Sequence, residues 1–283
     1  MISINTNYGG LFASKAASQS QRTLDTAMER LSTGMRINYA KDDAAGQAIS
    51  TRLTAEVEGL AMASRNAADA QSMIDTAEGA LQETTNLLMR MRELAVQASN
   101  GTLEDSDRTA LDAEFQAMEA EIDRINNNTT WAGNSVFNGN AKSFQVGTGN
   151  GGANSISHTF TSMAAHDLGV DSLGANNASG GSGTSADINA DLTSQANAQG
   201  MITAVDAGIA KVSAERGKLG ALSNRLTSTM ANLDQVAVNL SSSKGRILDA
   251  DFAAETANLA KGQILQQAAT AMLAQANASK QNV

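Results

Sequence analysis

The chain has 283 residues, a formal net charge of −9 at pH 7, and neither proline nor cysteine. The acidic balance argues against a nucleic-acid-binding surface, because that affinity comes largely from Lys and Arg that neutralise phosphates. The absence of cysteine excludes disulfides, thiolate metal sites and cysteine nucleophiles, and the absence of proline favours long uninterrupted helices, since average usage of about 5% would give roughly 14 prolines.

The N-terminal segment, residues 1–40, begins without charge and continues with an apolar stripe. Met1 to Ser14 has neither the basic n-region nor the apolar h-region of a secretory signal, so we expect no cleaved signal peptide. Chain ends are normally polar and frayed, whereas an apolar stripe predicts a helix that needs a partner. The stripe is broken only by Ser20 and consists of Ala13, Ala17, Leu24, Ala27 and Leu31.

A long heptad-patterned helix is predicted next. Asp42 and Asp43 suit its N-cap and first turn, and Asn100-Gly101 suits its end. At about 1.5 Å per residue it would span on the order of 80 Å. Two apolar seams along this segment have coiled-coil spacing, with Glu56 and Thr84 as exceptions. The seams are Leu53, Leu60, Ala67, Ile74, Leu81, Leu88 and Ala95, and Ala63, Ala70, Ala77, Met91 and Ala98.

Two further helices share this spacing and complete a predicted three-helix core. One follows Ser106 and stops at residues 126–128, and the other lies beyond the middle of the chain. We therefore predict a mainly α fold, a long antiparallel coiled-coil rod. The apolar positions are Leu111, Phe115, Met118, Ile122 and Ile125 in the first, and Val205, Val212, Leu219, Leu226, Leu233 and Leu240 in the second.

The middle segment is rich in Gly, Ser, Asn and Thr, and it predicts a small β-hairpin. Residues 143–146 and 155–161 read as strands, and the glycines between them, residues 147–152, read as the hairpin loop. These glycines satisfy a dinucleotide-binding spacing, but that motif requires a following helix, so we reject it. Residues 174–185 predict an exposed loop.

No catalytic constellation stands out, and we predict neither an enzyme nor a cofactor site. His158 and His166 lack metal-ligand spacing and read as solvated surface residues. Acidic pairs fit helix starts or solvent faces rather than acid–base catalysis. These pairs are Asp105 with Asp107, Glu119 with Glu121, and Asp249 with Asp251.

The C-terminal segment, residues 247–283, mirrors the N-terminal one. Gly262 to Ser279 carries no charge, yet its glutamines make it too polar for a membrane span. The two ends therefore bury each other or copies of the same chain. We expect both to be disordered in the isolated subunit and helical in a polymer. The predicted polymerisation core is Leu24, Leu31, Leu248, Phe252, Leu259, Ile264, Leu265, Met272 and Leu273.

Several motifs closely resemble those of bacterial flagellins. The longest is Leu31 to Ile49, LSTGMRINYAKDDAAGQAI, and others are Arg90 to Ala98, Phe144 to Gly147, and Arg246 to Glu255. The resemblance covers roughly residues 1–165 and 195–283. It implies a structural subunit of the flagellar filament whose terminal helices form an inner tube. Flagellins usually continue in a short Leu-rich tail, whereas this sequence stops at Val283.

The resemblance also implies domains, partners and sites. Residues 1–40 and 247–283 would be the halves of the terminal-helix domain, 41–130 and 196–246 the rod helices, and 131–195 the hairpin with a variable insert. Partners would be further copies, an export chaperone, the filament cap and the hook-filament junction protein, with unfolded export through the flagellar type III channel. Arg90, Leu94 and Glu114 match positions recognised by the flagellin-sensing Toll-like receptor, and we place all three on exposed helix faces.

Outward-facing hydroxyls of the insert are candidate O-glycan acceptors: Ser143, Thr148, Ser157, Thr161, Ser179 and Ser182. Three alternative functions remain open. A hook-filament junction protein would share the terminal helices, a flagellin with a protease in its insert would need a metal motif that the insert lacks, and a secreted coiled-coil adhesin or effector would leave the motifs unexplained.

Overall fold

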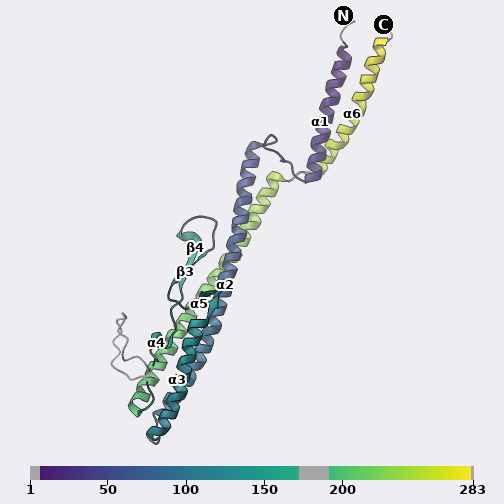
Figure 1. Ribbon diagram of the computed structural model, residues 1–283. Coiled ribbons are helices and arrows are strands. Elements are labelled where there is room, and N and C mark those ends of the chain that lie inside the picture. Colours follow the sequence, from purple (N-terminus) through teal and green to yellow (C-terminus); the bar gives the residue numbers. More distant parts are fainter. Residues whose placement is uncertain (1–6, 172–190, 282–283) are drawn as a thin grey trace. The chain divides into compact units, whose positions relative to one another are not determined.

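The computed structural model describes residues 7–171 and 191–281, which are mainly α-helical (Figure 1). The predicted fold class is confirmed. The chain divides into two compact units, Met1–Glu58 with Val236–Val283, and Gly59–Gln235, which we describe separately. The elements in chain order are α1 (Tyr8–Thr33), α2 (Ala44–Ala98), α3 (Asp105–Asn128), β1 (Thr130–Trp131), β2 (Asn134–Ser135), β3 (Ala141–Gln145), η1 (Gly152–Asn154), β4 (Ser155–Thr159), α4 (Ala165–Leu168), α5 (Gln195–Leu248) and α6 (Phe252–Gln281).

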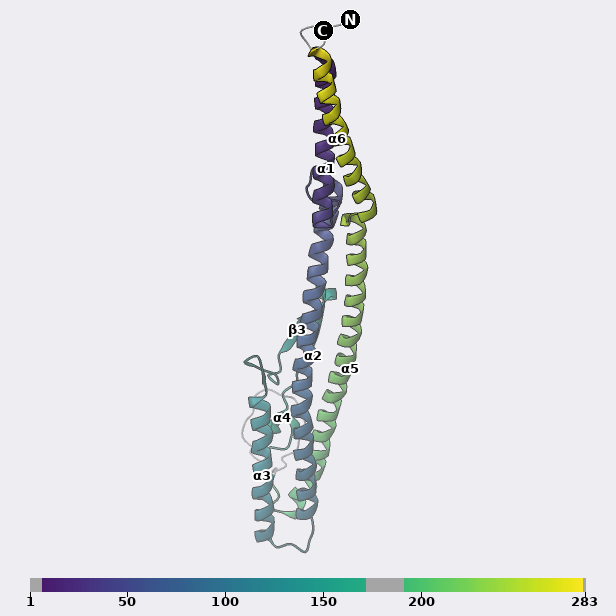
Figure 2. The same ribbon diagram turned by 90° about the vertical axis from the view of Figure 1, so that its right-hand side faces the viewer.

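The unit of residues 59–235 has a core formed by α2, α3 and α5, which lie alongside one another (Figure 2). Most residues of the predicted seams belong to this core, and Leu81, Phe115 and Val205 are fully buried in it. Polar contacts fix an antiparallel register of α2 and α5, because successive α2 residues meet α5 residues in reverse order. Gln71 contacts Ser223, Glu78 contacts Arg216 and Arg92 contacts Asp206, at 2.7 to 2.9 Å.

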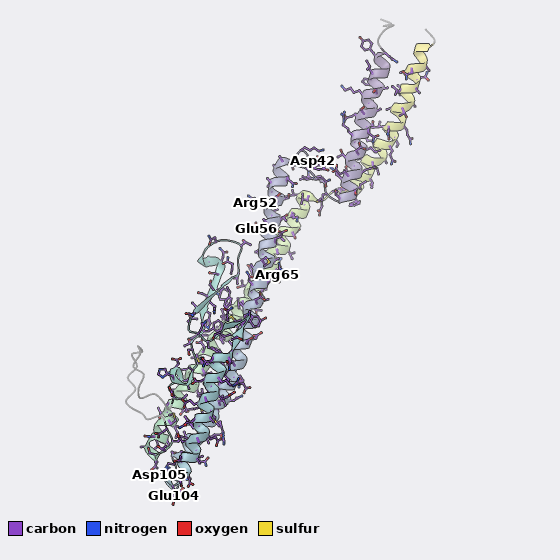
Figure 3. The ribbon with its side chains drawn as sticks, in the orientation of Figure 1. Asp42, Arg52, Glu56, Arg65, Glu104 and Asp105 are labelled. Carbon is purple, nitrogen blue, oxygen red and sulfur yellow. The ribbon has the colours of Figure 1, made fainter. Side chains whose placement is uncertain are left out.

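The start of α2 has the predicted cap. The Asp43 carboxylate accepts a hydrogen bond from Gly46 N at 2.9 Å. The neighbouring Asp42 accepts bonds from the backbone N–H groups of Tyr39 and Asn38, and these lower the pKa of its carboxyl. Asp105 lies in the first turn of α3 and projects into solvent, as predicted (Figure 3).

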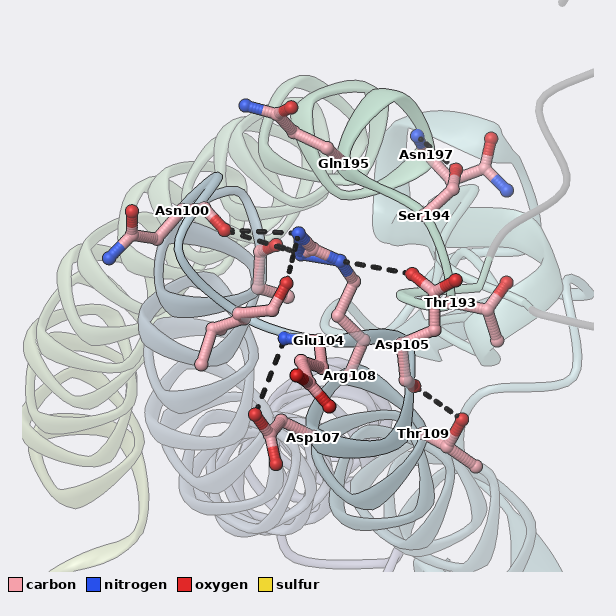
Figure 4. A network of polar contacts seen from close by, with 12 residues as sticks. Asn100, Glu104, Asp105, Asp107, Arg108, Thr109, Thr193, Ser194, Gln195 and Asn197 are labelled. Carbon is pink, nitrogen blue, oxygen red and sulfur yellow. Dashed lines mark hydrogen bonds and ion pairs between the residues drawn. The ribbon is translucent and has the colours of Figure 1, made fainter.

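The turn between α2 and α3 is held by a buried arginine. Arg108 donates hydrogen bonds to the carbonyls of Ala98 at 2.8 Å, Asn100 at 3.1 Å and Leu103 at 3.0 Å (Figure 4). The end of α2 leaves carbonyls without partners in the helix. Arg108 supplies donors to this turn, so a charged side chain has a structural role at a position the sequence analysis did not single out.

The middle of the chain forms two antiparallel hairpins. The predicted pairing of β3 with β4 is confirmed, with Ser143 opposite Ser157. Strand alternation turns Phe144 and Ile156 inward and both serines outward. The hairpin of β1 and β2 was not predicted; its two turn residues, Ala132 and Gly133, have φ of 49° and 80°, as a type I′ turn requires.

Two polar residues lie differently from the prediction. His158 was expected to be a solvated surface residue, but its imidazole is 13% exposed and lies 3.1 Å from Glu215 on α5. It also meets the Phe160 ring edge-on. Glu119 was expected on a solvent face but is buried. The hairpin of β3 and β4 packs on α5, where His158 meets Glu215. A local sequence pattern cannot predict burial by such a distant segment.

In the other unit, α1 and α6 pack antiparallel against each other. Gln21 meets Gln266, and Arg30 lies 3.7 Å from Glu255. At Gly262 an added Cβ would approach the Leu24 Cβ to 3.3 Å, so glycine permits the close approach. In the structure residues 8–33 and 252–281 are helical, because small residues let each helix cover one stripe of the other. The disorder of both segments in the isolated subunit stays a prediction.

Candidate functional site

An apolar groove lies between α1 and α6. Its volume is about 450 Å³, and Phe12 and Ala16 of α1 face Leu265, Ala268 and Met272 of α6 across it. No charged residue occurs among its lining residues. The lining is apolar apart from Ser20 and Gln275. A large contiguous apolar surface typically marks a contact with another molecule.

The structure divides the predicted polymerisation core into buried and exposed members. Leu24 is buried between the two helices, and Leu31, Leu248, Leu259 and Leu273 are half-buried. The others remain uncovered in the single chain. Their exposed fractions are 56% for Phe252, 66% for Ile264, 45% for Leu265 and 65% for Met272.

The N-terminal helix contributes exposed apolar residues that the sequence analysis missed. Leu11 and Phe12 are 61% and 77% exposed. The signal was available in the uncharged stretch before Lys15, but the predicted stripe began only at Ala13. Asn7 starts α1 earlier, because its side chain accepts a hydrogen bond from Gly10 N. This earlier start places Leu11 and Phe12 on the helix.

The three residues matched to receptor recognition are only partly brought together. Arg90 on α2 and Glu114 on α3 form an exposed ion pair at 3.0 Å, and Glu93 together with Glu114 raises the pKa of the Arg90 guanidinium. Leu94 is fully buried in the core, so its predicted exposure is wrong. The reason is that α2 is covered on more than one side in this unit, which buries Leu94 as well as the neighbouring seam residue Ala95.

A second groove, of about 400 Å³, lies beside Leu87 of α2 and Ile125 of α3. Charged side chains form part of its wall, and Arg124 there is hydrogen-bonded to Glu121 at 2.7 Å. This bond lowers the pKa of the Glu121 carboxyl. With Glu83, the wall carries two carboxylates and one guanidinium.

The candidate glycan acceptors differ in surroundings. Ser143, Ser157 and Thr161 are exposed. Thr148 is exposed overall, but its methyl group lies against α2 at Gly59, where an added Cβ would come within 2.7 Å of it. Ser179 and Ser182 lie outside the described residues.

Within residues 7–171 and 191–281, no three His, Asp or Glu side chains converge as metal ligands would. In the same part of the chain, no helix is both long and apolar enough to cross a membrane.

Comparison with known proteins gives consistent results along the chain. Family models match at both ends: the bacterial flagellin N-terminal helical region over residues 4–142, and the bacterial flagellin C-terminal helical region over residues 202–283. The chain is 39% identical to a flagellin of Bacillus subtilis, with 99% of this chain and 98% of that protein covered. It is 41% identical to a flagellin of Halalkalibacterium halodurans, with 91% and 89% covered.

Among solved structures, a putative flagellar hook-associated protein from Vibrio parahaemolyticus has a TM-score of 0.58. The sequences are 16% identical, and the match covers 74% of this chain and 100% of that one. This similarity concerns the fold alone. Nothing in the comparisons favours a hook-filament junction protein over a filament subunit.

Proposed function

The chain belongs to the bacterial flagellin family, and from this premise we propose that the exposed apolar surface of α1 and α6 is where copies of the chain join. As a flagellin it is a structural subunit of the flagellar filament, which is extracellular. The observation that carries the proposal is the exposure of Phe12, Ile264 and Met272 on a helix pair whose groove has no charged lining residue.

The energetics favour burial of this surface by further subunits. Each large apolar side chain moved from water into an apolar environment contributes roughly 1.5 to 3 kcal/mol. Phe12, Leu265 and Met272 line one groove and would be buried by one neighbour. A helix pair has only one mutual interface, so the faces that the partner helix does not reach are available to further chains.

The experiment is a charge placed in the groove. Leu265→Asp should abolish filament assembly, because a carboxylate would have to lie unpaired in an apolar contact. Leu265→Met keeps the surface apolar at similar volume and should preserve filaments. Electron microscopy scores the filaments, and circular dichroism of the soluble subunit checks that the helices persist. Normal filaments from Leu265→Asp would overturn the proposal.

The ion pair of Arg90 and Glu114 supports a second function, recognition by the flagellin-sensing Toll-like receptor of a host. Both side chains are about half exposed and belong to neighbouring helices. A receptor-reporter assay tests this. Arg90→Ala and Glu114→Ala should weaken signalling without changing thermal stability, and an unchanged response from both variants would refute it.

We propose that the chain has a purely structural role without catalysis. We also propose that it is exported as an unfolded chain, and that its partners are an export chaperone, the filament cap protein and the hook-filament junction protein. Absence of cysteine and proline suits such export, because neither disulfides nor prolyl isomerisation would delay refolding. A casein digestion assay on purified filaments tests the absence of protease activity.

Glycosylation of the outward hydroxyls is a further proposal for the filament surface. Ser143 and Ser157 lie opposite each other on the solvent side of the hairpin. Intact-mass measurement of sheared filaments tests this proposal. A mass equal to the 29.2 kDa of the bare chain would contradict it.

A further inference from the structure

The sequence contains three Asn-Gly pairs, Asn100-Gly101, Asn138-Gly139 and Asn150-Gly151. Asparagine is a thermolabile residue, and a following glycine has no side chain to hinder its backbone nitrogen from approaching the asparagine amide carbon. All three pairs lie in loops. Their surroundings therefore decide which of them reacts.

The pair Asn138-Gly139 is held by hydrogen bonds. Gly139 N, the atom that would attack, donates to Phe160 O at 3.1 Å. The Asn138 amide oxygen accepts from Asn140 N at 3.1 Å. Both partners of the reaction are thus fixed in other contacts.

The pair Asn100-Gly101 is also constrained, through the turn that Arg108 holds. The Asn100 backbone carbonyl accepts from Arg108 at 3.1 Å, and its amide oxygen accepts from Thr102 N at 3.3 Å. Reorientation of the Asn100 side chain toward Gly101 N would disturb this turn.

The pair Asn150-Gly151 lies in the loop between β3 and β4, and both residues are exposed. Gly151 O accepts from Asn154 N at 2.9 Å. In the described part of the chain, no hydrogen bond engages Gly151 N or the Asn150 side chain. An added Cβ at Gly151 would meet nothing within 4 Å, so the surroundings leave this pair room to move.

We propose that Asn150 is a site of spontaneous deamidation, with Gly151 N as the nucleophile. The nitrogen lone pair forms a bond to the Asn150 side-chain carbonyl carbon, Gly151 N gives up its proton, and the side-chain nitrogen leaves as ammonia. Water then opens the cyclic imide at either carbonyl, which yields aspartate or isoaspartate. The sum exchanges one amide NH₂ for OH without oxidation or reduction, and adds one negative charge to the hairpin loop.

The test compares the three pairs within one folded chain. Purified full-length protein is aged at mildly alkaline pH and digested with trypsin, which places the pairs in separate peptides, residues 93–108, 125–142 and 143–211. Mass spectrometry with electron-transfer fragmentation then measures aspartate and isoaspartate at each asparagine. Conversion at Asn150 should exceed that at Asn100 and at Asn138 several-fold.

Two controls separate structure from sequence. Gly151→Ala should remove most of the conversion at Asn150 without strain, since Gly151 has an extended backbone with φ of 163°. In guanidinium chloride the three pairs should react at similar rates. Equal conversion of the three pairs in the folded chain, or unchanged conversion in Gly151→Ala, would overturn the proposal.

Discussion

The three-helix unit and the terminal helix pair have similar apolar periodicity but different exposure. In the unit of residues 59–235, large apolar residues such as Leu88 and Phe115 are fully buried. In the terminal pair, Phe12 and Met272 remain exposed. The difference follows from the number of neighbours, because a helix with one partner buries one stripe and a helix with several partners buries more. Exposed stripes are thus a consequence of having one partner within the chain.

Limited proteolysis should give the largest contrast between the two units. We expect trypsin to cleave soluble subunit at Lys15 and Lys261 roughly tenfold or more faster than at Arg92 and Lys211, because segments with few buried apolar contacts open locally at low free energy. Mass spectrometry of early fragments measures the order. Cleavage of Arg92 as rapidly as Lys15 would contradict the difference in stability between the units.

Leu94 and Arg90 are four residues apart on α2, but truncation of the buried leucine should affect stability far more than truncation of the exposed arginine. Leu94→Ala should lower the free energy of unfolding by roughly 2 to 5 kcal/mol, because it leaves a cavity among buried side chains. Arg90→Ala, four residues earlier on the exposed face, should leave thermal stability almost unchanged. Chemical denaturation measures both. If Leu94→Ala is as stable as the parent chain, its burial does not contribute as the structure indicates.

Loss of the buried arginine should have a comparable or somewhat smaller effect. Arg108→Ala removes donors to the carbonyls of Ala98, Asn100 and Leu103, and should cost roughly 2 to 4 kcal/mol of unfolding free energy, since hydrogen bonds to charged groups are strong and the carbonyls lose partners. The matched control is Arg124→Ala, which removes an exposed ion pair with Glu121 and should change stability little. Equal losses of unfolding free energy in the two variants would show that the hydrogen bonds of Arg108 stabilise the fold no more than an exposed ion pair does.

Acidification should give the smallest effect, confined to the loop before α2. The pKa of Asp42 is lowered in the folded chain by hydrogen bonds from Tyr39 and Asn38. A depressed carboxyl pKa stabilises the fold above the ordinary carboxyl pKa, and this contribution is lost as pH falls through the folded value. Amide exchange at Tyr39 should therefore accelerate in acid relative to core amides. In Asp42→Asn it should already be fast at neutral pH.

The sequence alone determined the secondary structure and the core seams with few errors. Heptad spacing predicted the helices and the burial of Leu81 and Val205, and a glycine-rich run between short apolar segments predicted the hairpin of β3 and β4. These features depend on neighbours a few residues away, which a pattern records directly.

Only the tertiary structure decided which flanks of each helix are covered. Leu94 is buried although it had been placed on an exposed face, His158 pairs with Glu215 on α5, and Gly262 allows α1 and α6 to pack in a single chain. Each of these outcomes depends on a segment far away in sequence. Periodicity identifies an apolar stripe and the helix face on which it lies. Long-range packing decides which segment covers that stripe and how much of the helix surface it buries.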